Sequence, residues 1–364
     1  MSLPSIRTFL ASLACLTWLA ATVPAFAQTE DGVVVQQAPK KKKARKVEDG
    51  SLNDRVNRGM VSIVTSDDDT ETVNDIARAM NEEGRMRVVP ILGESAVANV
   101  RDLLYLRGVD AGILNADVLP YLRLTGDMPA AQRRVRYVTK LYDKTVFLIT
   151  GPSGSSLAEL AGKKVATAGK ETDSGVTART VLSLSKIDAE LVATTTPKAV
   201  EGVLTGEYAA FIAVSRDAAS LLRFIPDGSG LKIAPLPIST ALSEIYAPRR
   251  LAAIEAPSLL PEDGIETLTV PALLAVFDWK QGGPRYAPVA GFSAKLIDQT
   301  ASAASFENGR AWREMTPDVE IAGWRRFDAA AEEINATATA RKAIARPAPG
   351  SDATAGGAVV AAVP

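Results

Sequence analysis

The sequence predicts an α/β protein made of two lobes that face each other across a ligand cleft. Three observations lead to this prediction. Short apolar runs alternate with helical patterns between residues 60 and 214, which is typical of parallel strands with helices on the sheet faces. The alternation occurs in two separate series, joined by strand-like residues 136–150. Strand-like residues 270–277 then return the chain to the first series, so each lobe is expected to be a mixed sheet flanked by helices.

The first series provides the core of one lobe. The predicted strands are 60–64, 86–92 and 111–114, and the predicted helices are 72–81 and 95–107. Ligands in sheets of this kind bind beyond the carboxyl ends of the strands. We therefore expect ligand contacts in the loops 65–71, 93–95 and 115–119.

The second series provides the other lobe. Predicted strands 136–142 and 145–150 carry the chain out of the first lobe, and a short helix 157–160 follows. The second series then has predicted strands 163–168, 190–195 and 209–214 and predicted helices 175–185 and 197–206, with a further strand at 231–234. After the returning strand 270–277, a helical pattern covers residues 292–313. The chain thus leaves the first lobe, completes the second and comes back.

Composition excludes several functional classes. The chain of 364 residues has a formal net charge of −1, whereas a general nucleic-acid binder carries a basic face. Histidine is absent and Cys15 is the only cysteine, so neither a Ser-His or Cys-His pair nor a zinc site with the usual ligands can form. We expect a protein that is not an enzyme, with no cofactor and no catalytic residue.

Residues 1–27 have the parts of a secretory signal peptide. Arg7 supplies the positive charge, residues 9–21 are apolar, and Ala25-Phe26-Ala27 is a cleavage site. The apolar run is too short for a membrane-spanning helix. We therefore expect cleavage after Ala27 and a soluble protein in the periplasm.

Two further segments are unlike the central region. Residues 28–57 are polar and contain the basic block Lys40–Lys46, which predicts a disordered linker. Residues 336–364 are rich in Ala, Thr, Pro and Gly, and such a composition cannot bury a core, so we expect a flexible tail.

The stretch 169–182 has the pattern of a polar loop that leads from a strand into a helix. The first N–H groups of such a helix and its dipole form a site for a carboxylate or a phosphate. Thr172, Asp173, Ser174 and Thr177 are suited to touch a ligand there. The same residue types also cap ordinary helices, so the pattern alone leaves both interpretations open.

Five segments together resemble one protein family. Residues 99–117 read N-V-R-D-L-L-Y-L-R-G-V-D-A-G-I-L-N-A-D, 156–165 read S-L-A-E-L-A-G-K-K-V, and 172–182 read T-D-S-G-V-T-A-R-T-V-L. Trp312–Met315 and Gly323–Phe327 follow near the end. In order and spacing they resemble the TAXI family of solute-binding receptors for TRAP transporters, over roughly residues 58–334.

The resemblance implies a periplasmic-binding-protein fold of type II. Lobe 1 is then residues 58–148 and 271–335, and lobe 2 is residues 149–270. The implied function is capture of a small organic acid or amino acid and its delivery to TRAP membrane subunits. The candidate ligand-binding residues are Ser66, Asp68, Thr70, Ser95, Asn99, Asn115, Asp117, Thr172, Asp173, Ser174, Gly175, Thr177 and Ser215.

The first loop differs from the family pattern, because it is acidic where relatives are rich in Gly and Thr. It reads T-S-D-D-D-T-E at 65–71, and Glu94 lies in the second loop. Several carboxylates would repel an anionic ligand. Three alternatives follow: the ligand is zwitterionic or cationic, the acids cap the first helix and point away, or a metal ion accompanies the ligand.

Two further points stay open. Tyr246, Arg249 and Arg250 lie in a segment between the lobes and are suited to reach the cleft, where arginine binds carboxylates well. The acidic loop, the basic linker and the tail also fit a second function, a binding-protein fold that has lost transport and serves as a periplasmic sensory or interaction module.

Overall fold

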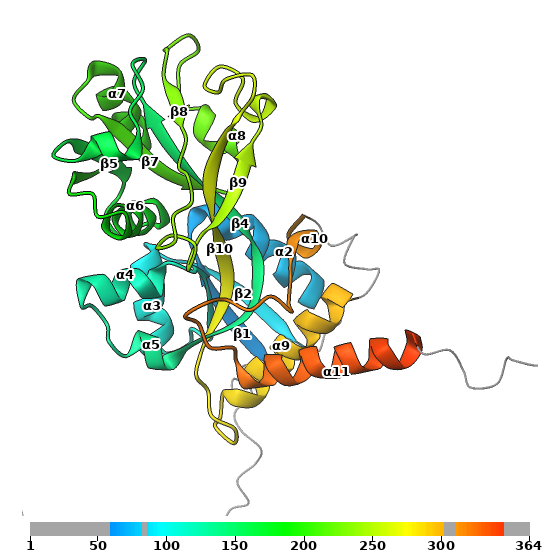
Figure 1. The fold of residues 1–364 in the computed structure, drawn as a ribbon. Helices are drawn as coiled ribbons and strands as arrows, with labels where there is room; N and C mark the ends of the chain where they lie inside the picture. Colours follow the sequence, from blue (N-terminus) through cyan, green and yellow to red (C-terminus); the bar gives the residue numbers. More distant parts are fainter. Residues whose placement is uncertain (1–58, 82–85, 302–309, 346–364) are drawn as a thin grey trace, which may run out of the picture. The chain divides into compact units, whose positions relative to one another are not determined.

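A single mixed sheet runs through both lobes of the protein (Figure 1). The computed structural model describes residues 59–81, 86–301 and 310–345. Within them the strand order is β2-β1-β3-β10-β4-β7-β5-β6, with β8 paired to β4 and β9 to β10. Strands β1, β2 and β3 are parallel to one another, and so are β5, β6 and β7. The two βαβ series and the mixed sheets predicted from the sequence are therefore confirmed.

Lobe 1 contains the first series. Its elements are β1 (Met60–Thr65), η1 (Asp67–Asp69), α2 (Thr70–Asn81), β2 (Arg87–Leu92), α3 (Ala96–Tyr105), β3 (Ala111–Asn115), α4 (Val118–Thr125) and α5 (Ala131–Arg134). Helix α2 forms as expected from its apolar stripe, because Val73, Ile76 and Met80 are all fully buried against the sheet.

Lobe 2 contains the second series. Its elements are η2 (Leu157–Leu160), β5 (Lys164–Ala168), α6 (Asp173–Leu184), β6 (Glu190–Thr194), α7 (Thr196–Thr205), β7 (Ala210–Ser215), α8 (Ala218–Leu222), β8 (Lys232–Ala234), β9 (Ala247–Leu251) and η3 (Ala253–Glu255). Phe211 on β7 and Val203 on α7 pack together in its core.

Two long strands join the lobes. Strand β4 (Val135–Thr150) pairs with β10 (Ile265–Phe277) along most of its length and then with β7, from Thr145↔Ser215 to Thr150↔Ala210. The two strands lie side by side through both lobes in Figure 1. The break between two strands that the sequence predicts at residues 143–144 is wrong, because the ladder to β10 continues through both positions.

The last elements pack on lobe 1. Helix α9 (Tyr286–Ala301) and helix α11 (Asp328–Ala345) contact each other, with α10 (Arg310–Glu314) between them in the chain (Figure 1). The predicted helix over 292–313 begins earlier in the structure, at Tyr286, while residues 302–309 between α9 and α10 lie outside the described residues. Trp312 and Trp324 are buried, as core residues would be.

The sequence predictions for the two ends have different outcomes. Helix α11 continues to Ala345, so residues 336–345 are helical and do not belong to a flexible tail. The predicted signal peptide, the basic linker and residues 346–364 lie outside the described residues. Among the helices that the structure describes, none is both long and apolar enough to cross a membrane.

Candidate functional site

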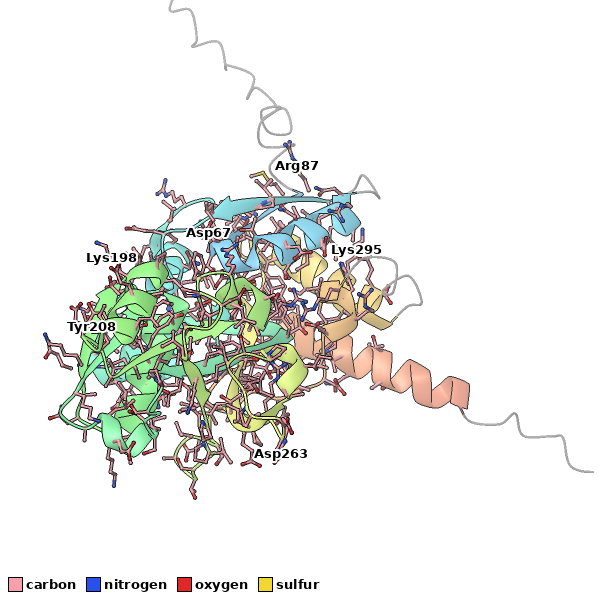
Figure 2. The ribbon with its side chains drawn as sticks, turned by 90° about the horizontal axis from the view of Figure 1, so that it is seen from above. Asp67, Arg87, Lys198, Tyr208, Asp263 and Lys295 are labelled. Carbon is pink, nitrogen blue, oxygen red and sulfur yellow. The ribbon has the colours of Figure 1, made fainter. Side chains whose placement is uncertain are left out.

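A cavity of about 300 Å³ lies between the lobes. From lobe 1 it is lined by Ser66, Asp67, Asp68 and residues 93–96, and from lobe 2 by Ala168, residues 172–174, Thr196, residues 213–215, Ser220, Leu221, Arg223 and Phe224. Asp67 lies between the blue elements of lobe 1 and the green elements of lobe 2 in Figure 2. Most of these residues follow the carboxyl ends of parallel strands, which is where ligands bind in such sheets. We call this cavity the cleft pocket.

The structure brings part of the candidate set to the cleft pocket. The candidates that line it are Ser66, Asp68, Ser95, Thr172, Asp173, Ser174 and Ser215. The candidates that do not line it are Thr70, Asn99, Asn115, Asp117, Gly175 and Thr177. Thr70 begins α2 and donates to the Ser66 carbonyl at 3.1 Å. Ligand binding by any of these residues stays a prediction.

The mouth of the cleft pocket is acidic. Asp67, Asp68 and Glu94 are exposed and line it, and Arg223 supplies the positive charge, with its guanidinium 4.7 Å from the Phe224 ring centroid. Burial raises the pKa of Asp68, while Lys144 opposes that shift. The acids of the first loop therefore do not all point away, because Asp67 and Asp68 face the space that a solute would fill.

The third acid of this loop points inward to a buried lysine. Lys144, on β4, is fully buried, and its Nζ lies 2.7 Å from Asp69 Oδ1 and 2.8 Å from Asp69 Oδ2. The same Nζ donates to Asp173 Oδ2 at 2.5 Å. Tyr142 Oη donates to Asp69 Oδ1 at 2.5 Å, and Ser66 Oγ donates to Asp69 Oδ2 at 2.8 Å. One ammonium thus links a carboxylate of lobe 1 to a carboxylate of lobe 2.

Electrostatics keep this lysine charged. Burial by itself lowers the pKa of Lys144, but Asp173 and Asp69 raise it more, so the net shift is well above the ordinary value. The pKa of Tyr142 is also raised well above its usual range, by burial and by the neighbouring Asp69. The phenol therefore stays protonated and donates. We call Asp69, Tyr142, Lys144 and Asp173 the lysine network.

Lys144 is not among the candidate residues that the sequence predicts. It lies at the predicted break between two strands, which the structure does not contain. The available signal was the period of two along β4, because Tyr142, Lys144 and Val146 share one face and all are buried. A lysine at a core position of a strand requires a counter-ion, so this pattern calls for buried acids elsewhere.

The start of α6 is capped by the protein itself. Thr172 is the N-cap, its Oγ1 accepts from Gly175 N–H at 3.3 Å, and it donates to the Ala168 carbonyl. Ser174 Oγ accepts from Val214 N–H at 3.0 Å. The interpretation of this stretch as a helix cap is confirmed, and the interpretation as a ligand contact stays open beside it.

Gly175 has a steric role at this helix start. A Cβ atom placed there would lie closer than 3.0 Å to the carbonyl oxygens of Gly169 and Lys170. Gly175→Ala is therefore expected to lower the free energy of unfolding by about 2 kcal/mol in chemical denaturation, because the loop must shift. Gly291, in α9, is exposed with no such neighbours, and Gly291→Ala is expected to be slightly stabilising instead. Equal effects of the two substitutions would contradict this role.

A second polar cluster joins the lobes away from the cleft pocket. Asp117 Oδ2 accepts from Thr177 Oγ1 at 2.5 Å and from Tyr246 Oη at 2.9 Å. All three side chains are buried. Burial raises the pKa of Asp117 to about 6, although hydrogen bonds from Thr177 and Tyr246 oppose the shift. Tyr246 thus joins lobe 2 to lobe 1 and does not line the cleft pocket.

Two candidate asparagines are buried near the strand ends of lobe 1. Asn99 and Asn115 are almost completely inaccessible, and neither amide has a hydrogen-bond partner among the described residues. Asn99 lies directly against Gly93, where any added Cβ would collide with its amide. Buried amides of this kind are normally satisfied by protein or water, so these two positions are unusual for a core.

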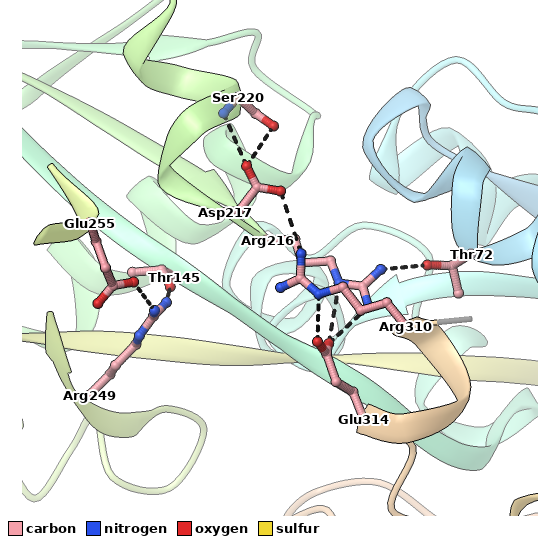
Figure 3. Close-up of polar contacts among 9 residues, drawn as sticks. All are labelled: Thr72, Thr145, Arg216, Asp217, Ser220, Arg249, Glu255, Arg310 and Glu314. Atoms are coloured by element: carbon pink, nitrogen blue, oxygen red, sulfur yellow. Dashed lines mark hydrogen bonds and ion pairs between the residues drawn. The ribbon is translucent and has the colours of Figure 1, made fainter. Parts of the chain in front are cut away.

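The arginines near the lobe junction have partners within the protein (Figure 3). Arg216, after β7, donates to Thr72 Oγ1 at 3.0 Å and to Glu314 Oε2 at 2.9 Å, and its guanidinium lies 4.1 Å from the Tyr142 ring centroid. Arg249 contacts Thr145 and Glu255, and Arg250 donates to a backbone carbonyl. Neither Arg249 nor Arg250 reaches the cleft pocket.

The described residues contain no cluster of three or more Asp, Glu, Cys or His side chains arranged to hold a metal ion. A larger groove of about 830 Å³ lies between α4 and α6, where Gly175 is one of its lining residues. Its lining mixes both charges, from Lys170 and Arg179 to Asp127 and Glu171.

Comparisons with known proteins give similarity in fold only. No protein-family model matches the sequence. None of the curated proteins matches it either.

Among solved structures, XAC2383 from Xanthomonas citri, bound to chloride, is similar at 12% identity over 78% of this chain and 99% of that chain, with a TM-score of 0.48. The periplasmic aliphatic sulphonate binding protein SsuA from Escherichia coli follows at 12% identity, 79% and 94% coverage and a TM-score of 0.39. The GluR0 ligand-binding core from Nostoc punctiforme, in complex with glutamate, has 13% identity, 66% and 93% coverage and a TM-score of 0.39. At such identities and TM-scores the similarity carries no argument about ligand or function.

Proposed function

We propose that this protein is a periplasmic solute-binding receptor that captures a small amino acid or organic acid between its lobes. The observation that carries the proposal is the cleft pocket, a polar cavity of about 300 Å³ with walls from both lobes. Its place at the carboxyl ends of parallel strands is the usual place for a ligand in such sheets. A cavity of this size suits a small-molecule solute such as an amino acid.

The charges at the mouth favour an amino acid within this class. Asp67, Asp68 and Glu94 on lobe 1 attract an ammonium group, while Arg223 on lobe 2 attracts a carboxylate. A zwitterion satisfies both sides. A dicarboxylate places its second negative charge beside the acids, so we expect it to bind more weakly.

Delivery to a TRAP-type membrane transporter is the finer part of the proposal. Its support is the resemblance of residues 99–117, 156–165 and 172–182 to the TAXI family. The signal-peptide pattern at residues 1–27 supports a periplasmic location. The proposed lobe boundaries are residues 58–148 and 271–335 for lobe 1 and 149–270 for lobe 2.

Thermal unfolding of the mature chain in the presence of single solutes tests the proposal. The panel consists of amino acids, mono- and dicarboxylates, polyamines and divalent cations. A solute at 100 times its dissociation constant adds about 2.7 kcal/mol to the free energy of unfolding. We expect an increase in Tm with an amino acid and a smaller increase with dicarboxylates at the same concentration. For the amino acid, the increase should be smaller in Asp68→Asn than in the unaltered chain.

One observation favours a second function, a transport-inactive sensory or interaction module. The carboxylate at the start of α6 and the adjacent hydroxyls already bind partners within the protein. A protein of that kind shows no change in Tm with any solute of the panel after removal of copurified ligand. This outcome would contradict the receptor proposal.

A further inference from the structure

We propose that Asp173 acts as a built-in anionic ligand: its carboxylate takes the place of a bound anion at the start of α6 and, through Lys144, holds the two lobes closed without a solute. The proposal goes beyond the receptor function and does not depend on it, because it concerns the protein with an empty cleft. It rests on the contacts, burial and charges of the lysine network.

Asp173 lies at a place where a helix attracts an anion. It is the first residue of α6, where the helix dipole and the free N–H groups favour a negative charge. Its side chain lines the cleft pocket and is 11% exposed, so it forms part of the pocket floor. The anion found at this helix start therefore belongs to the chain itself.

Lys144 binds both lobes at once. Its Nζ lies 2.5 Å from Asp173 Oδ2 in lobe 2 and 2.7 Å from Asp69 Oδ1 in lobe 1, and its side chain is completely inaccessible. Because the lysine is anchored on β4, it cannot follow both acids when the lobes separate. Opening of the cleft must break at least one of these two charge-assisted contacts.

Contacts next to the lysine network also cross the lobe junction. Val97 N–H, in α3, donates to the carbonyl of Glu171, two residues before Asp173, at 3.2 Å. Arg216 stacks on Tyr142, which donates to Asp69, so a lobe 2 residue is joined to the same network. The start of α6 is thus held against lobe 1 by side chains and backbone alike.

Distances between spin labels on the two lobes test the proposal. The mature chain has no cysteine after the predicted cleavage, so Arg101→Cys on α3 and Lys198→Cys on α7, both exposed, place one label in each lobe. The protein is unfolded, washed free of copurified solute and refolded. We expect one narrow distance distribution for this parent, and an added population at longer distances for Asp173→Ala.

Acetate supplies a specific rescue, because it has the size and charge of the missing side chain. In Asp173→Ala, sodium acetate is expected to restore the narrow distribution, whereas sodium chloride at the same ionic strength is not. The exchange of the Val97 amide is expected to be about tenfold faster in Asp173→Ala and to slow again with acetate. The variant is expected to fold, because Lys144 retains Asp69 as its counter-ion.

The matched control is Asp75→Ala, which removes a mostly buried carboxylate whose partner Arg78 lies in the same helix of lobe 1. It is expected to keep the parent distribution. A parent that populates the longer distance without solute, or an Asp173→Ala distribution equal to that of the parent, overturns the proposal. Acetate that acts no better than chloride overturns the assignment of Asp173 as a stand-in for a bound anion.

Discussion

Replacing Lys144 by methionine is expected to lower the free energy of unfolding by about 3–5 kcal/mol, measured by chemical denaturation at neutral pH. The substitution keeps the volume of the side chain but leaves Asp69 and Asp173 buried without their cation. A carboxylate that is buried without a counter-ion loses its hydration, and no attraction compensates for that loss. The loss should shrink as the pH falls, because the carboxylates then bind protons and become neutral.

Lys140→Met is the matched control on the same strand. Lys140 pairs with Asp143 at 2.7 Å, but Asp143 is 40% exposed, so water can replace the lysine. We expect a loss of less than about 1 kcal/mol. If Lys144→Met cost no more than Lys140→Met, the lysine network would not be the buried charge cluster described above.

Asp117→Asn is expected to change the pH dependence of stability. The folded carboxyl titrates at about 6, against 3.8 for the ordinary group. Between these values the folded state binds more protons than the unfolded state, so the stability of the unaltered protein falls as the pH rises through this window. The difference between the two pKa values corresponds to a fall of about 3 kcal/mol in the free energy of unfolding across this window. Asparagine does not titrate, so Asp117→Asn abolishes this fall.

The measurement is the free energy of unfolding of both proteins from below pH 3.8 to above pH 6. The variant should gain about 3 kcal/mol relative to the unaltered chain over this range, whatever its stability at the acid end. Tyr246→Phe should enlarge the fall with pH, because the Tyr246 hydroxyl donates to the charged carboxylate. Parallel pH profiles for the unaltered chain and Asp117→Asn would contradict the burial of an ionisable Asp117.

Local patterns were enough to predict the alternating elements and the place of the cleft. Strand β1 is a short apolar run that is buried on both faces, and helix α2 has the period of 3.6 of a helix with one buried face, so both elements are visible in the sequence. The rule that ligands lie beyond the carboxyl ends of parallel strands led to the loops that contain Ser66 and Ser95, which do line the cleft pocket. The helix-start pattern at residues 169–182 led to Asp173, which also lines it.

The lysine network could not be predicted from the sequence, because its partners lie far apart along the chain. Asp69 and Asp173 lie 75 and 29 positions from Lys144, and Arg216 lies 98 positions from Glu314. No local period reports partners at such separations. The polar pair Asp143-Lys144 was taken for the end of a strand, whereas pairing with Val270 and Pro271 of β10 holds it inside one.

The structure also distinguishes candidate residues that look equivalent in the sequence, because their buried polar contacts differ. Thr172 and Thr177 lie on one short stretch and have the same chemistry. The first caps α6 beside the cleft pocket, while the second turns to Asp117 on the other side of the helix. The partner that each threonine contacts depends on how α6 packs against lobe 1.

Retention of solute by the mature protein tests the central claim of a receptor cleft most directly. The ligand-free protein is incubated with a small-molecule extract and filtered, and the released solutes are identified by mass spectrometry. Ser220→Trp fills the cleft pocket from α8, and Ser183→Trp is the matched exposed serine on α6, at the other groove. We predict that the unaltered chain and Ser183→Trp retain the same amino acid in stoichiometric amounts and that Ser220→Trp does not. Retention of no solute, or equal retention by Ser220→Trp, would contradict the claim.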